Sequence, residues 1–126
     1  MSTTVVDDPA DLLVSLGSLH DVRIERVCYE SDANRLRIKV WDLNWNAERE
    51  PGYVARPCDL VFSEIRAFSI VAGQDRFHTT LVSEGVIITE AYAISKEALW
   101  RMDAVMHTSE RWYVEFGRLE IEDMPR

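Results

Sequence analysis

Residues 35–40 carry the strongest structural signal in this chain. Charged and apolar side chains alternate there in the run Arg-Leu-Arg-Ile-Lys-Val. Because successive side chains of a strand point to opposite faces, this run predicts a β-strand with one buried face and one charged face. A turn at residues 31–34 connects it to an earlier strand that begins at Val22 and changes phase near Glu25 and Arg26, which indicates a β-bulge. The sequence therefore predicts an antiparallel hairpin.

Residues 8–17, which precede this hairpin, have the signals of a short amphipathic helix. Asp8 is a capping residue type, Pro9 suits the first helical position, and Gly17 supplies a stop. Leucines recur between these signals at helical spacing: Leu12, Leu13 and Leu16. We expect residues 1–7 to form a flexible N-terminus.

The middle of the chain contains one irregular segment followed by strand-like segments. Pro51 and Pro57 exclude an uninterrupted central strand from residues 46–57. A strand is predicted over residues 60–70, with a bulge near residues 63–64. Two turns and two further strands complete this part, namely turns at 73–75 and 83–85 and strands over 77–82 and 86–93.

Residues 98–107 fit both a helical and a strand pattern, and periodicity alone does not separate the two. We prefer a strand, because the short connection at 108–110 suits a hairpin into the strong strand that begins at Trp112. Gly117 is expected to form a bulge that restores the phase before Leu119.

These segments predict a mainly β (α+β) fold in one domain spanning residues 1–126. We expect an antiparallel curled sheet, or a sandwich or half-barrel, of about six to seven strands with one short N-terminal helix. A length of 126 residues with 47% hydrophobic residues is sufficient for a core without covalent crosslinks.

Charge and composition limit the classes of partner. The net charge is -8, and the basic residues are scattered rather than gathered on one surface, which argues against nucleic-acid binding. The chain has neither an apolar run long enough to span a membrane nor a secretion signal, so we expect a cytoplasmic protein. In that reducing compartment, Cys28 and Cys58 are expected to be free thiols.

His20 and Asp21 resemble part of a catalytic group but are better explained by a structural role. If both belonged to a strand, their side chains would point to opposite faces and would not pair with each other. Instead, His20 would bond the last carbonyl groups of the helix, and Asp21 would accept backbone N–H groups at the turn.

Metal binding and nucleophilic catalysis have little support. The histidines and cysteines lack the close spacing of metal ligands, and the glycine-rich and serine motifs of common enzymes are absent from the sequence. We therefore predict no catalytic residue, no metal and no cofactor. The histidines concerned are His20, His78 and His107.

The region from Trp41 to Tyr53 is the strongest candidate for partner binding. Its aromatic side chains suit the anchors of an interface, and its acidic side chains suit a negative rim around them. The candidate residues are Trp41, Asp42, Trp45, Glu48, Glu50 and Tyr53. The alternative is that Trp41 and Leu43 complete the core while Trp45 covers its edge.

The run Ser18-Leu19-His20-Asp21-Val22-Arg23-Ile24, followed by a hairpin and by a closing segment over residues 116–122, resembles a loosely defined group of small bacterial domains. Those domains open with a Leu-His-Asp-x-x-Ile motif and end in a strand of the Leu-Glu-Ile type. Some of them are thought to be immunity proteins of polymorphic-toxin systems, which bind and silence a toxin. The resemblance implies a binding function but identifies no partner.

Three hypotheses follow. The first is a non-enzymatic, immunity-like binding protein that masks a basic partner, such as a toxin, with an acidic and aromatic surface. The second is a small enzyme or ligand-binding domain with a pocket between the sheet and the N-terminal helix, which would use His20. The third is a homodimer or larger homo-oligomer that pairs exposed strand edges.

Overall fold

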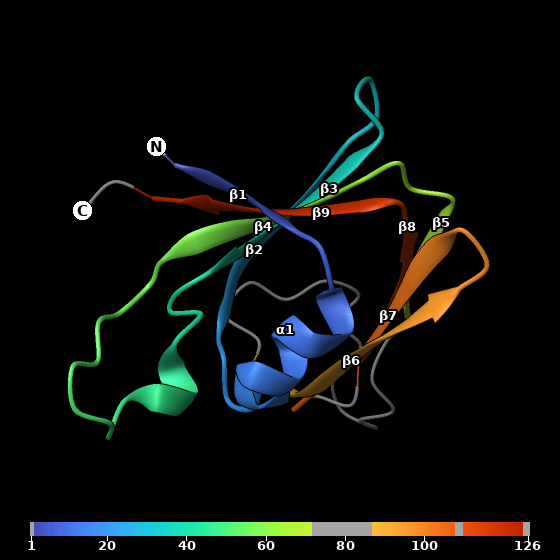
Figure 1. Cartoon of the computed structure of the whole chain (residues 1–126). Coiled ribbons are helices and arrows are strands. Elements are labelled where there is room, and N and C mark those ends of the chain that lie inside the picture. Colours follow the sequence, from blue (N-terminus) through green and yellow to red (C-terminus); the bar gives the residue numbers. More distant parts are fainter. Residues whose placement is uncertain (1, 72–86, 108–109, 125–126) are drawn as a thin grey trace.

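The computed structural model describes residues 2–71, 87–107 and 110–124. The described residues form two antiparallel sheets and one α-helix (Figure 1). The five-stranded sheet has the order β1 (Thr3–Val6), β9 (Arg118–Asp123), β4 (Cys58–Ser63), β3 (Arg35–Val40) and β2 (Ile24–Glu30). The four-stranded sheet has the order β5 (Ala67–Val71), β8 (Arg111–Phe116), β7 (Leu99–Met106) and β6 (Ile88–Lys96). The predicted mainly β class with a short helix is confirmed.

The predicted hairpin is formed by β2 and β3. Val27 pairs with Ile38, and the register shifts between Ile24 and Arg26, so the bulge is also confirmed. In β3 the three aliphatic side chains are buried and the three charged ones are half-buried, as the alternation requires.

Two segments that the sequence presents as single bulged strands each divide between the two sheets. The chain leaves β4 at Ser63 and enters β5 at Ala67, and it leaves β8 at Phe116 and enters β9 at Arg118. The predicted bulges near residues 63–64 and at Gly117 are therefore corners. Both a bulge and a corner shift the phase of the apolar pattern, so periodicity alone does not distinguish them.

The two corners contact each other closely. Gly117 donates its N–H to the carbonyl groups of Ser63 and Glu64, both at 3.1 Å. A Cβ added at Gly117 would lie 2.9 Å from Cβ of Glu64 and would also overlap its carboxylate, so this position has no room for a side chain. Phe62 and Phe116 pack edge to face beneath the corners, with ring centroids 4.9 Å apart.

The strand interpretation of residues 98–107 is confirmed, because β7 spans Leu99–Met106 and buries Met102, Ala104 and Met106. The predicted strand over 77–82 and the turns at 73–75 and 83–85 lie outside the described residues.

The N-terminal helix is also confirmed. Helix α1 spans Pro9–Ser15, and the Asp8 carboxylate accepts the N–H of Asp11 at 3.0 Å. The expectation of a flexible segment over residues 1–7 is wrong, because Thr3–Val6 form β1 and pair with β9. Four residues of strand-forming type are too few to show a period, so this edge strand has no clear sequence signal.

The core lies between the sheets and is covered on one side by α1, which packs beside β6 (Figure 1). Its largest fully buried side chains include Trp112, Phe62 and Phe116. Both cysteines are free thiols, as predicted, and burial raises the pKa of Cys58 to about 12. Within the described part of the chain, no helix is long and apolar enough to cross a bilayer.

Candidate functional site

The connection between β3 and β4, residues 41–57, projects away from both sheets (Figure 1). We call it the binding loop, because the sequence predicts that a partner binds there. It contains one short 3-10 turn, η2 (Trp45–Ala47), and is otherwise irregular, as its prolines predict. The loop is nevertheless closed at its base, where Leu43 is fully buried and donates its N–H to the carbonyl of Arg56 at 2.9 Å.

Asp42 holds the binding loop together from inside. Its Oδ1 accepts the N–H groups of Asn44 at 3.0 Å and Arg56 at 2.8 Å, and its Oδ2 accepts the hydroxyl of Tyr53. This hydrogen bond is the main reason that the pKa of Tyr53 rises to about 12. Asp42 is only 9% exposed, so it does not lie in an exposed acidic rim as expected. Its three donors come from positions that are separated in sequence, and the pattern of residue types does not show that the loop brings them together.

One side of the binding loop is tied to the end of α1. Asn46 donates its side-chain N–H to the carbonyl of Leu16 at 3.0 Å, beside Gly17. Gly17 has a φ of +67°, and a Cβ there would lie 3.0 Å from Cγ of Asn46, so glycine suits both the conformation and the close approach. A shallow cleft of about 280 Å³ lies between the helix end and η2.

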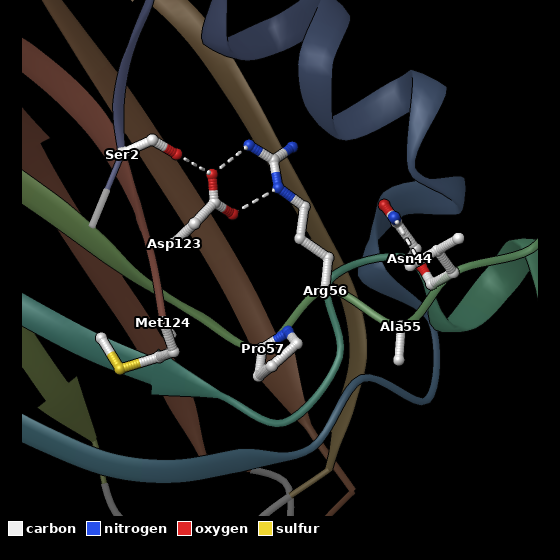
Figure 2. A pocket seen from close by; sticks show the side chains of 8 residues that line it. Ser2, Asn44, Ala55, Arg56, Pro57, Asp123 and Met124 are labelled. Carbon is white, nitrogen blue, oxygen red and sulfur yellow. Dashed lines mark hydrogen bonds and ion pairs between the residues drawn. The ribbon is translucent and has the colours of Figure 1, made fainter. Parts of the chain in front are cut away.

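The other side of the binding loop is tied to the two ends of the chain. Arg56 donates two hydrogen bonds to Asp123, from Nε to Oδ1 at 2.7 Å and from Nη2 to Oδ2 at 3.2 Å. Ser2 also donates its hydroxyl to Asp123, at 3.1 Å (Figure 2). These residues border a cleft of about 290 Å³ together with Asn44 and the segment 54–57. The charges of Arg56 and Asp123 in this cleft already pair with each other, and this pair anchors the loop.

Aromatic and acidic side chains remain on the outer surface of the binding loop. Trp41 is 53% exposed and Trp45 43% exposed, and Glu48 and Glu50 are exposed as well. The alternative in which Trp41 completes the core is therefore wrong, although Leu43 does so. Tyr53 is half-buried and donates to Asp42, so it supports the loop from within.

A cleft of about 480 Å³ lies beside the two exposed tryptophans. We call it the tryptophan cleft. Its lining consists of Asp21, Arg23, Trp41, Asp42, Trp45, Ala55 and Ile87. The guanidinium carbon of Arg23 lies 4.6 Å from the centroid of the Trp41 ring, a cation–π contact.

Arg23 and Ile87 were missed as candidates. The hairpin register contains a signal for Arg23, because Ile24 pairs with Val40 and the next position places Arg23 opposite Trp41. The N–H of Trp41 does donate to the carbonyl of Arg23, at 3.1 Å. Ile87 comes from a distant part of the chain and has no comparable signal.

The side chains of His20 and Asp21 lie close to each other, contrary to the argument from strand alternation. His20 Nε2 lies 3.4 Å from Asp21 Oδ2, and the two side chains are 61% and 59% exposed. Neither residue belongs to a strand, and Asp21 has a φ of 64°, so alternation does not apply. The other ring nitrogen of His20, Nδ1, bonds the carbonyl oxygen of Thr89 at 2.9 Å rather than a carbonyl of the helix. His20 thus connects the turn after α1 to β6.

Among the described residues, no three histidine, cysteine, aspartate or glutamate side chains are grouped so that they could hold a metal ion. His107 lies at the end of β7, where its Nδ1 is 2.9 Å from the N–H of Ile87. His78 lies outside the described part of the chain.

No protein-family model matches the chain, and the comparison with curated proteins finds no match. Among solved structures, the chain is similar to the crystal structure of an uncharacterized protein from Neisseria gonorrhoeae, with a TM-score of 0.55 and 9% sequence identity. The alignment covers 98% of this chain and 100% of that chain. At this identity the similarity shows the fold alone.

Proposed function

We propose that this protein is a non-enzymatic binding module that uses the binding loop to mask a basic protein partner in the cytoplasm. The observation that carries the proposal is the way the loop distributes its side chains. The hydrogen bonds of Asp42 and Tyr53 hold the loop together from inside, while Trp41 and Trp45 remain exposed on its surface. A loop that is ordered before binding loses less conformational entropy when it meets a partner.

Electrostatics supports a basic partner. Glu48 and Glu50 are exposed beside Trp45, and the chain as a whole carries a net charge of -8. Exposed charges of one sign accelerate encounter with a partner of the opposite sign, and exposed tryptophans provide the apolar anchor that slows its release. An immunity-type protein that silences a basic toxin would use a surface of this kind, and that is the specific form of binding we propose.

The test is affinity capture from the native host, followed by binding kinetics with the purified partner. The double variant Glu48→Lys/Glu50→Lys should slow association by about tenfold at low salt and reduce the salt dependence. Trp45→Ala should mainly speed dissociation, also by about tenfold.

A matched control is the double variant Glu90→Lys/Glu97→Lys, which makes the same change in net charge at exposed positions of β6 and the turn after it. It should leave association nearly unchanged. Equal slowing by both double variants would show that net charge rather than the binding loop guides the encounter, and unchanged kinetics in all three variants would place the interface elsewhere.

A further inference from the structure

The guanidinium of Arg23 lies at the edge of the tryptophan cleft. It is exposed and stacks against Trp41, and within the described residues no carboxylate or carbonyl group accepts a hydrogen bond from it. Stacking on a ring leaves the N–H donors of a guanidinium available. A planar guanidinium with free donors matches the two oxygens of a carboxylate.

Two carboxylates, those of Asp21 and Asp42, also line the tryptophan cleft. The Asp42 carboxylate accepts from Asn44, Arg56 and Tyr53. Asp21 lies 3.4 Å from His20 Nε2. Arg23 is therefore the charged group of this lining that can donate hydrogen bonds to an anionic ligand.

The remaining side chains that line the cleft are apolar, and two of them have flat aromatic rings. They are Trp41, Trp45, Ala55 and Ile87. A volume of about 480 Å³ lies within the range of roughly 300–1,000 Å³ typical of small-molecule sites. An apolar wall beside one fixed cation favours a ligand with an aromatic body and an anionic end.

We propose that the tryptophan cleft binds an aromatic carboxylate, with the carboxylate on Arg23 and the ring beside Trp41 and Trp45. This site is distinct from the acidic outer surface of Glu48 and Glu50, although both use Trp45. The same ligand chemistry occurs in a free aromatic acid and at the C-terminus of a peptide that ends in an aromatic residue.

The experiment is a titration of the full chain, followed by NMR signals of the Trp41 and Trp45 indole N–H groups. The first pair of probes is 3-phenylpropionate and 3-phenylpropionamide, which share the aromatic body and differ in charge. The second pair is a short peptide ending in phenylalanine, with either a free or an amidated C-terminus. In each pair the acid should bind about tenfold more tightly than its amide, since hydrogen bonds to a charged acceptor are about twice as strong as neutral ones. The tighter acid identifies the source.

Variants test whether Arg23 is responsible. Arg23→Gln should abolish the preference for the acid, and Arg23→Lys should keep part of it, because lysine retains the charge but lacks the fork. The matched control is Arg26→Gln, since Arg26 is also exposed in this region of the hairpin but lines a different groove, beside Cys28 and Lys39. Thermal unfolding verifies that each variant is folded.

Equal affinity for acid and amide in the wild-type chain would overturn the proposal, as would equal losses in Arg23→Gln and Arg26→Gln. Unperturbed Trp41 and Trp45 signals with every probe at millimolar concentration would also overturn it. These outcomes are distinguishable from a failure of the proposed basic partner, which is tested separately by the association rates of Glu48→Lys/Glu50→Lys and its control Glu90→Lys/Glu97→Lys.

Discussion

The outer faces of the two sheets carry many charges, and so does the binding loop. On the sheets these charges pair with one another, whereas in the loop some of them stay exposed. On the five-stranded sheet, Arg37 lies between Glu30, Asp59 and Glu122, at nitrogen–oxygen distances of 3.3, 2.9 and 3.1 Å. In the binding loop, the carboxylate of Asp42 turns inward and the charges of Glu48 and Glu50 stay exposed.

This difference separates a surface whose charges already have partners from the surface that we propose binds a partner. A partner that approaches Arg37 must compete with three carboxylates that are already in place, so a new ion pair there brings little net gain. A partner that approaches the binding loop meets exposed tryptophans and acidic groups on a backbone that is already fixed. The density of charge therefore says less about binding than the number of charges that already have partners.

The largest effect is expected from breaking the loop at its centre. Asp42→Ala removes the acceptor of two backbone N–H groups and of the Tyr53 hydroxyl. We expect a loss of about 1–3 kcal/mol in the free energy of unfolding, because buried donors lose their partner. Denaturant unfolding measures the loss, and hydrogen exchange at the amides of Asn44 and Arg56 locates it.

Asp32→Ala is the matched control, since Asp32 is exposed in the turn between β2 and β3. Its effect should stay within about 0.5 kcal/mol, as for most surface substitutions. Equal stability of the two variants would contradict the assignment of Asp42 as the internal support of the loop.

A second prediction concerns Glu115, a charge on the outer face of the four-stranded sheet that already has partners on that face. It is 4% exposed, accepts from the Tyr113 hydroxyl, and lies 2.7 Å from Arg66 Nε and 3.5 Å from Lys96 Nζ. The Tyr113 hydrogen bond, and next the bond from Arg66, lower the pKa of Glu115 from 4.5 to about 2. Because the folded pKa is the lower one, Glu115 stabilises the fold above pH 4.5, and this contribution is lost as the pH falls towards 2.

Denaturant unfolding across that pH range measures the contribution. Glu115→Gln should be less stable than the wild type at pH 7 and should show a smaller decline between pH 4.5 and 2. Glu97→Gln, at a side chain that is 76% exposed, should follow the wild-type curve. Parallel curves for all three proteins would show that the cluster around Glu115 does not act as described.

Much of the fold follows from local patterns, and the exceptions share a cause. The alternation over residues 35–40, the cap at Asp8 and the stop at Gly17 are local signals, and the structure confirms the elements they predict. The corners at Glu64 and Gly117 depend instead on contact between distant segments, as does the pairing of β1 with β9. Local periodicity contains no record of such contacts.

The candidate site shows the same division. The exposed positions of Trp45, Glu48 and Glu50 agree with the sequence argument, because they lie in an irregular and polar segment. Asp42 has the same neighbours in sequence and the opposite environment, since its surroundings are set by how the loop closes. Residue type indicates which side chains can bind a partner, and loop closure decides which of them remain available.

The smallest expected effect tests the inner bond of the binding loop by a single atom. Tyr53→Phe keeps the ring and removes the hydroxyl that donates to Asp42. The folded pKa of Tyr53 is raised from 10.0 to about 12, so the bond stabilises the fold fully below pH 10 and is lost as the pH rises towards 12. In the wild type, ultraviolet absorbance should therefore show a phenol that ionises near pH 12 while the chain is folded, and Tyr53→Phe should reduce the amplitude of that late step. Tyr92→Phe, at an exposed tyrosine of β6, should leave the late step in place. If Tyr53→Phe also leaves it unchanged, the hydroxyl does not bond Asp42 in solution. The contrast between a loop held by internal hydrogen bonds and a sheet whose charges pair on its outer face then loses its main support.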